Sequence, residues 1–143
     1  MIRYENNKRV CSRGITFIGD SVLLIKRHNI KSSVLDYYTV PGGGVEDYED
    51  YAQAAVRETM EETCCSVEVI KYLEKEDFGL GICYWFYTKY ISGNPTLGGE
   101  ELERNNKDNY YEVVLINMND LDNIFIFGRG KELIKKCYNE YKR

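Results

Sequence analysis

The sequence predicts an α/β or α+β fold in which helices pack on one mixed β-sheet. Segments rich in β-branched and aromatic residues recur along the chain, which is typical of strands. Two segments show the apolar spacing of a helix, and no repeat or linker separates the elements. With 143 residues, 43% of them hydrophobic and 29% charged, the chain is expected to form a single domain over residues 1–143.

The first half of the chain should contain three strands and a helix. Two strands are expected at about residues 10–18 and 21–27, joined by a turn at Gly19 and Asp20. A short strand should end just before Pro41, where three glycines follow. A helix is then expected from about Asp50 to Thr63.

The second half should contain three strands and a final helix. Residues 66–79, 81–92 and 112–118 are rich in β-branched and aromatic side chains and are expected to be strands. Between the last two lies a long, charged, turn-rich loop, a kind of segment that is often functional. The segment 130–143 carries apolar residues at helical spacing.

The charge and the cysteine content exclude several classes of function. A net charge of −4 and a pI near 5.1 argue against a nucleic-acid-binding surface, and they favour a metal partner if the protein handles phosphates. Five cysteines without paired CxxC motifs, and a single histidine, argue against a zinc cluster. The polar N-terminal segment and the short apolar runs indicate no signal peptide and no membrane span. We therefore expect a cytoplasmic protein with free thiols.

The helix expected at 50–63 carries an unusual number of carboxylates. Helical spacing places Glu58, Glu61 and Glu62 on one side and an apolar set on the other, which we expect to face the core (Ala52, Val56, Thr59, Met60 and Thr63). An acidic face in solvent would explain the pattern, and so would a site for Mg²⁺, which prefers oxygen ligands. The glycine-rich turn before the helix favours the second reading, because it lets backbone come close to a phosphate or a metal.

The spacing of these residues resembles the Nudix box, the signature of the Nudix hydrolases. Gly43 is followed after five residues by Glu49, and after seven more by the run Arg57-Glu58-x-x-Glu61-Glu62. The segments VLLIKR and YYTVPGGGVE also resemble those that lead into the box in MutT-like members. Two positions depart from the pattern: Thr59 stands where the family has an aliphatic residue, and Cys64 stands where it has glycine. If Cys64 takes a left-handed conformation, the cost is on the order of 1 kcal/mol.

The resemblance implies a Nudix-type α/β/α sandwich that hydrolyses a nucleoside diphosphate linked to another group X. It implies Mg²⁺ or Mn²⁺ as cofactor, held by Glu58, Glu61 and Glu62 with a backbone carbonyl of Gly42 or Gly43. Glu49 would pair with Arg57 and could touch a metal or water. Glu58 is the first choice for the general base, although some members use a later loop glutamate, for which this chain offers Glu100, Glu101 and Glu103.

The substrate side of the expected site is less specific. Arg27 is expected to contact phosphate and Tyr38 the nucleoside, with the backbone at Gly43 and Gly44 beside the phosphates. No extended motif of the NADH-, ADP-ribose- or coenzyme-A-directed branches is present, which favours a nucleoside triphosphate and a MutT-like role. A Nudix-fold module that binds a nucleotide without cleaving it is the alternative, and a homodimer is left open.

Overall fold

The computed structural model describes residues 1–31, 36–98 and 105–142. Its strands are β1 (Tyr4–Glu5), β2 (Lys8–Ile18), β3 (Ser21–Asn29), β4 (Asp36–Thr39), β5 (Gly42–Gly44), β6 (Ser66–Asp77), β7 (Gly81–Ser92) and β8 (Asn109–Asn117). Its helices are α1 (Tyr51–Thr63) and α3 (Gly130–Cys137), with a 3-10 turn at Met118–Asn123 and a π-helical end at Tyr138–Lys142. The predicted strands and helices occur in the expected order, and β1 and β5 are additional: the glycines expected as a turn form the short strand β5.

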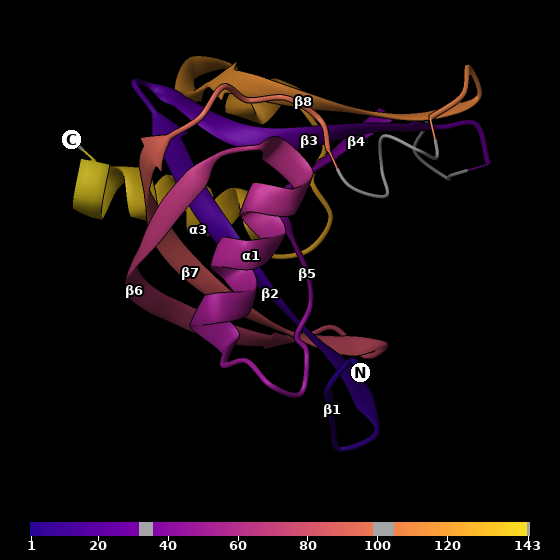
Figure 1. Ribbon diagram of the computed structural model, residues 1–143. Helices are drawn as coiled ribbons and strands as arrows, with labels where there is room; N and C mark the ends of the chain where they lie inside the picture. Colours follow the sequence, from indigo (N-terminus) through magenta and orange to yellow (C-terminus); the bar gives the residue numbers. More distant parts are fainter. Residues whose placement is uncertain (32–35, 99–104, 143) are drawn as a thin grey trace.

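The strands form one mixed sheet in the order β4-β3-β2-β7-β6, and β8 pairs with β3 on a branch. Neighbouring strands run antiparallel except β2 and β7, which are parallel and pair Arg9 with Gly81 through to Phe17 with Lys89. The short strand β5 pairs with the first half of β2, so that Ser12 lies opposite Gly43. This pairing places the glycines beside the centre of the sheet (Figure 1).

Helices cover the two faces of the sheet, which confirms the predicted layered α+β fold. On one face Ala54 and Ala55 of α1 pack against Val10, Ile82 and other buried residues. On the opposite face Leu133, Ile134 and Cys137 of α3 pack on a larger core from β2, β3 and β7. Figure 1 shows α1 in front of the strands and α3 behind them.

Helix α1 begins and ends as its sequence indicates. Asp50 caps the first turn: its side chain accepts from the Gln53 backbone, and the Gln53 side chain accepts from the Asp50 backbone. The helix ends at Cys64, whose φ of 60° and ψ of 21° are left-handed. A side chain pays about 1 kcal/mol for that conformation, which is why glycine is common there.

The expected orientation of α1 is wrong in one respect. Met60, which was placed toward the core, is 44% exposed, whereas Glu62 is only 7% exposed. The buried side of the helix runs through Ala54, Ala55 and Thr59, so that it is rotated toward the glutamates. The three-glycine strand β5 contributes to this orientation, because the Glu58 carboxylate occupies the space that a side chain at position 43 would fill.

Two further properties bear on function. Within the described ranges, no helix is both long enough and apolar enough to cross a membrane. All five cysteines are free, in agreement with the expectation from the sequence, and Cys65, Cys83 and Cys137 are buried.

Candidate active site

An ion pair fixes the turn before α1 to the middle of the helix. Arg57 donates from Nη2 to Oε1 of Glu49 at 2.6 Å and from Nε to Oε2 at 3.0 Å, and its Nη2 also reaches the Gly44 carbonyl oxygen at 2.9 Å. The Arg57 hydrogen bonds, helped by one from the Glu46 backbone, lower the pKa of Glu49 against the opposing effect of burial. Glu49 is 5% exposed, so this pair holds β5, the turn and α1 as one unit.

Glu58 lies directly against β5. A β-carbon at position 43 would lie 2.5 Å from Cδ of Glu58, so that only glycine leaves room for this carboxylate. Arg57 Nη1 donates to Glu58 at 3.0 Å and to the half-exposed Glu61 at 3.2 Å. Burial raises the pKa of Glu58 most, and the charge of Glu61 adds to it, while Arg57 and a hydrogen bond with Glu62 oppose the rise.

The carboxylates are the type of ligand that a hard divalent cation prefers, although their oxygens do not converge on one point. No three His, Cys, Asp or Glu side chains in the described part of the chain already converge as a set of metal ligands. Glu58 and the buried Glu62 nevertheless share a hydrogen bond, and two carboxylates in contact repel each other unless a proton or a cation lies between them. An all-oxygen donor set is what Mg²⁺ prefers. Gly43, rather than Gly42, is the glycine that touches Glu58, since Gly42 is packed on β2.

Arg13 is a site residue that sequence reasoning missed. It lies on β2 opposite Gly42, and its Nη1 donates to the Val40 carbonyl oxygen at 2.6 Å. Burial alone would lower the pKa of Arg13, but the Cys83 and Cys11 thiols and the Glu62 carboxylate raise it overall. The available signal was that Arg9, Cys11 and Arg13 alternate along β2 and so lie on the same face of the strand.

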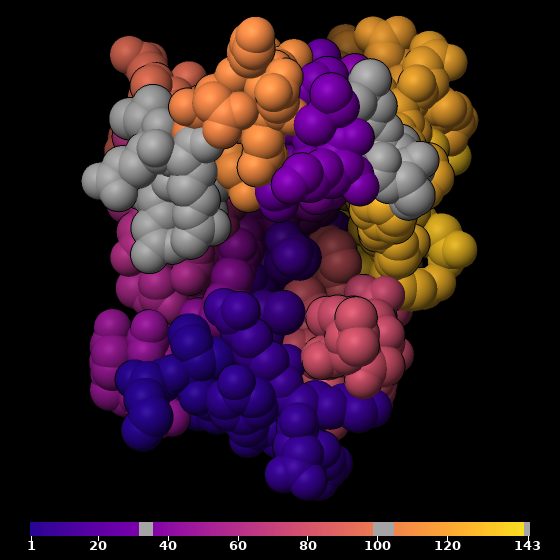
Figure 2. Space-filling model, turned by 90° about the vertical axis from the view of Figure 1, so that its right-hand side faces the viewer, coloured from indigo at the N-terminus to yellow at the C-terminus, as the bar shows by residue number. Residues whose placement is uncertain are grey.

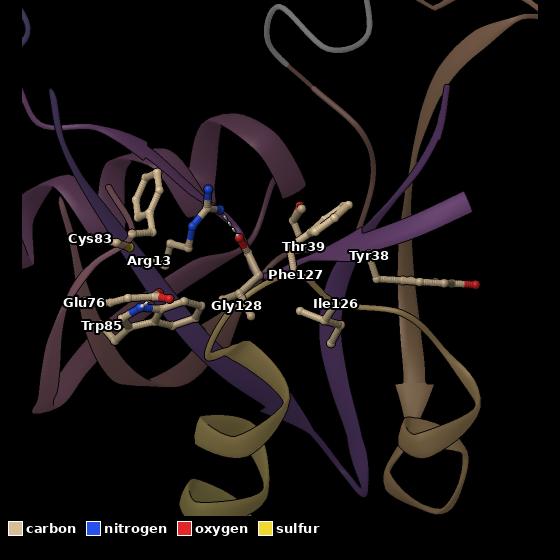
Figure 3. Close-up of a pocket in the computed structure, with 11 residues that line it drawn as sticks. Arg13, Tyr38, Thr39, Glu76, Cys83, Trp85, Ile126, Phe127 and Gly128 are labelled. Atoms are coloured by element: carbon tan, nitrogen blue, oxygen red, sulfur yellow. Dashed lines mark hydrogen bonds between the residues drawn. The ribbon is translucent and has the colours of Figure 1, made fainter. Parts of the chain in front are cut away.

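Two hollows meet at Arg13. The first is a groove of about 300 Å³ beside the glycines, lined by Arg9, Cys11, Arg13, Gly43, Gly44, Phe78, Leu80 and Gly81. The second is a cavity of about 190 Å³ (Figure 3), lined by Arg13, Tyr38, Thr39, Val40, Glu76, Phe78, Cys83, Trp85, Ile126, Phe127 and Gly128. Figure 2 shows this side of the molecule hollowed at its centre, above the N-terminal segment and the hairpin that joins β6 to β7 and below the purple and orange segments. We call the two together the cleft.

The two residues predicted for the substrate side lie differently. Arg27 stacks over the Tyr111 ring at 4.6 Å and donates to Asn109 at 3.3 Å, so that its described contacts are with β8 and not with β5 or α1. Tyr38 does line the cavity, but Figure 3 shows its ring extending away from Arg13 and Trp85. The loop glutamates Glu100, Glu101 and Glu103 lie outside the described residues.

The structure is a layered α/β/α fold with a carboxylate-rich helix behind a glycine strand, and comparisons with known proteins identify its family. A model of the NUDIX domain matches residues 8–123. The chain therefore belongs to the NUDIX family. A search of curated proteins gave no match.

Solved structures agree with this assignment. A NUDIX hydrolase from Nitrosomonas europaea is 25% identical, with 99% of this chain and 75% of that chain covered and a TM-score of 0.70. A MutT structure from Aliivibrio salmonicida or Vibrio cholerae has 21% identity, coverages of 92% and 97%, and a TM-score of 0.60. An ADP-ribose pyrophosphatase from Streptococcus suis has 15% identity, coverages of 94% and 92%, and a TM-score of 0.65. The last two comparisons support the fold alone.

Proposed function

We propose that the protein is a pyrophosphohydrolase that needs a divalent cation and cleaves a nucleoside diphosphate linked to another group, with nucleoside triphosphates as the first substrate class. One observation carries the proposal. The Glu58 carboxyl group lies against Gly43 of β5 and touches that of Glu62, and Gly43 lines the groove together with Arg9 and Arg13. Carboxylates and guanidinium groups thus gather around the same glycine strand.

Each residue of this arrangement has a role in the proposal. Glu58 and Glu62, with Glu61, would hold Mg²⁺ or Mn²⁺, whose positive charge offsets that of the pyrophosphate and makes water a better nucleophile. Arg57 carries no catalytic proton in this scheme: it holds Glu58 and Glu61 in place while Glu49 holds Arg57. Arg13, which lines the groove, would donate to phosphate oxygens.

Glu58 is our assignment for the general base. Its carboxylate lies against Gly43, a residue that lines the groove, so it is placed close to where a water would meet the phosphates. Glu49 is a poorer base, because Arg57 donates to both of its oxygens and lowers its pKa. A glutamate among Glu100, Glu101 and Glu103 is the competing assignment.

A release assay on a nucleotide panel tests the proposal. Wild-type protein and Glu58→Gln would be incubated with nucleoside triphosphates, oxidised nucleotides, dinucleoside polyphosphates and nucleotide sugars, each with Mg²⁺, with Mn²⁺ or with a chelator. We expect turnover of one class that requires the metal and is lost in the variant. Glu68→Gln is the matched control, because Glu68 is an exposed glutamate on β6.

The alternative is a module that binds a nucleotide without cleaving it. The intact set Glu58, Glu61 and Glu62 disfavours it, because binding alone does not need these carboxylates. If no member of the panel is hydrolysed while one of them raises the melting temperature, the alternative replaces the proposal.

A further inference from the structure

The cavity beside the groove contains a single acidic residue among its described lining. Glu76 extends from the end of β6 next to Trp85 and Gly128, and Phe78 and Phe127 also line the cavity (Figure 3). Its volume, about 190 Å³, compares with the roughly 150 Å³ of an engineered cavity that holds one benzene ring. The cavity thus has room for an aromatic ring system and has a carboxylate in its wall.

Contacts on two sides fix the position of this carboxylate. Trp85 donates from Nε1 to Oε1 of Glu76 at 3.0 Å. Gly128 lies against the other oxygen: a β-carbon there would come within 2.9 Å of Oε2. The neighbouring Arg129 is itself anchored to β6, since it donates to both oxygens of Glu74 at 2.8 and 3.0 Å. Glu76 is therefore held in place before any ligand enters.

The carboxylate still has unused capacity to accept hydrogen bonds. Each of its oxygens has two lone pairs, and the Trp85 bond is its one hydrogen bond within the described residues. The nearby cation Arg129 is engaged by Glu74 and Glu132, and Arg13 donates to the Val40 carbonyl oxygen. A ligand in this cavity would therefore meet a negative, acceptor-only group that needs N–H donors.

We propose that the cavity binds the base of the substrate and that Glu76 selects a guanine-type base. A carboxylate pairs best with two adjacent donors. On their Watson–Crick edges adenine and cytosine each place an acceptor nitrogen beside their amino group, and uracil places its one N–H between two carbonyls. Guanine alone presents N1–H and the 2-amino group side by side, and guanines oxidised at C8 keep that edge. This inference rests on the proposed function and names its substrate class.

The remaining lining fits a base whose phosphates point toward the glycines. Phe78 and Phe127 are 50% and 48% exposed, which is unusual for large apolar side chains and leaves their rings available to a flat partner. Phe78 and Arg13 line both the cavity and the groove. A base beside Glu76 would therefore direct its phosphates past Arg13 toward Gly43, the residue that Glu58 touches.

Trp85 can report binding in the cavity through its fluorescence, because it is the only tryptophan of the chain and donates a hydrogen bond to Glu76. Guanosine, inosine and adenosine 5′-monophosphates would be titrated in chelator, with fluorescence excited where nucleotides are transparent and with equilibrium dialysis as a second readout. We expect GMP to bind more tightly than AMP by about 10- to 100-fold. IMP, which lacks the 2-amino group, should lie between them.

The decisive variant is Glu76→Gln, with Glu68→Gln as the matched control on the same strand. A glutamine amide offers one acceptor and one donor, which repels the guanine edge and fits adenine. We therefore expect the GMP preference to be lost and the GMP-to-AMP ratio to fall by about 10- to 100-fold, with no change in the control. Circular dichroism spectra and thermal melts of both variants would show that they fold.

Two outcomes would overturn the inference. One is equal affinity of the wild type for the three monophosphates, and the other is an unchanged GMP-to-AMP ratio in folded Glu76→Gln. If either occurs while the panel assay still shows turnover, the proposed function stands and the base assignment falls. If GMP binds in a Glu76-dependent way but no nucleotide is hydrolysed, the hydrolase proposal falls and the base site stands.

Discussion

The two halves of the cleft differ in how far apart in sequence their residues lie. The phosphate half, which comprises Gly43, Glu49, Arg57, Glu58 and Glu62, comes from one stretch of about twenty residues that forms a strand, a turn and a helix. The cavity half, which we define as the 11 residues lining the cavity, is drawn from β2, β4, β6, β7 and the loop before α3.

This difference explains why one half is a motif and the other is not. In the phosphate half each residue supports its neighbour: Glu49 binds Arg57, Arg57 binds Glu58, and Glu58 lies on Gly43. Such a unit keeps its geometry only if the spacing is kept. The cavity half is assembled by sheet register, so that single residues such as Glu76 can vary without disturbing the others. The residues proposed to bind the metal and the phosphates are thus close together in the sequence, whereas those proposed to select the base are brought together only by the fold.

The largest effect is expected from variants that remove a carboxylate from the phosphate half and leave the cavity half unchanged. Glu58→Gln and Glu62→Gln should each lower kcat by roughly 10²–10³-fold or more, while the Trp85 response to GMP remains. The free energy of unfolding in the absence of metal should not fall, because each variant removes one of two mutually repelling carboxylates, of which Glu62 is buried and Glu58 partly buried. Steady-state kinetics measures kcat, and urea unfolding measures the free energy of unfolding. A variant that unfolds would show that these glutamates serve structure.

The second test removes the ion pair between Glu49 and Arg57 in the phosphate half. Glu49→Gln leaves Arg57 without its main partner and should cost about 3 kcal/mol of unfolding free energy. The pKa of Glu49 is lowered on folding from 4.5, so the pair stabilises the protein above about pH 4.5 and that stability is lost as the pH falls below it. Urea unfolding at several pH values should show a smaller loss on the acid side in the variant. Equal acid sensitivity of both proteins would contradict this.

The third test addresses the boundary between the halves. Arg13→Ala should lower kcat/KM by about 10- to 100-fold, the loss expected for a hydrogen bond to a charged group. Arg13→Lys keeps the charge but not the fork of donors, so that it should recover only part of the loss. Arg27→Ala is the comparison, because its guanidinium contacts Tyr111 and Asn109. A larger effect at Arg27 than at Arg13 would reverse our assignment of the phosphate contact.

The smallest effect is expected at the far end of α1, outside both halves. Cys64→Gly should raise the free energy of unfolding by about 0.5–1 kcal/mol, since glycine takes the left-handed conformation without the steric cost. Activity and GMP affinity should not change. A change in kcat in this variant would mean that the end of the helix influences the carboxylates.

More residues of the phosphate half than of the cavity half could be predicted from the sequence. The longer strands, the bounds of α1 and the left-handed conformation at Cys64 follow from local rules of alternation and chain geometry. The orientation of α1 did not, because it depends on tertiary packing: Glu58 lies in the space that glycine leaves at position 43, and Glu62 is buried. Periodicity alone assigns a glutamate to solvent.

Arg13 and Glu76 were missed for a related reason. Neither belongs to a motif, and the position of each side chain depends on partners distant in sequence. Arg13 is held by Val40, and Glu76 is held by Trp85 and Gly128. Arg27 is a candidate from sequence because it ends the strand before the box, whereas in the structure its guanidinium lies over Tyr111 of β8. Without the register of β2 with β5 and β7, no reading of the sequence could rank the two arginines.

The parallel pairing of β2 with β7 also sets the order in which the molecule can assemble. It joins Val10 to Ile82, and the intervening chain includes all of α1. Closing so long a loop is entropically costly and slow compared with forming a helix. Helix α1 can therefore form early, but the strands beneath it meet late. We expect the refolding rate to depend on substitutions in the β2–β7 interface more than on helix propensity in α1.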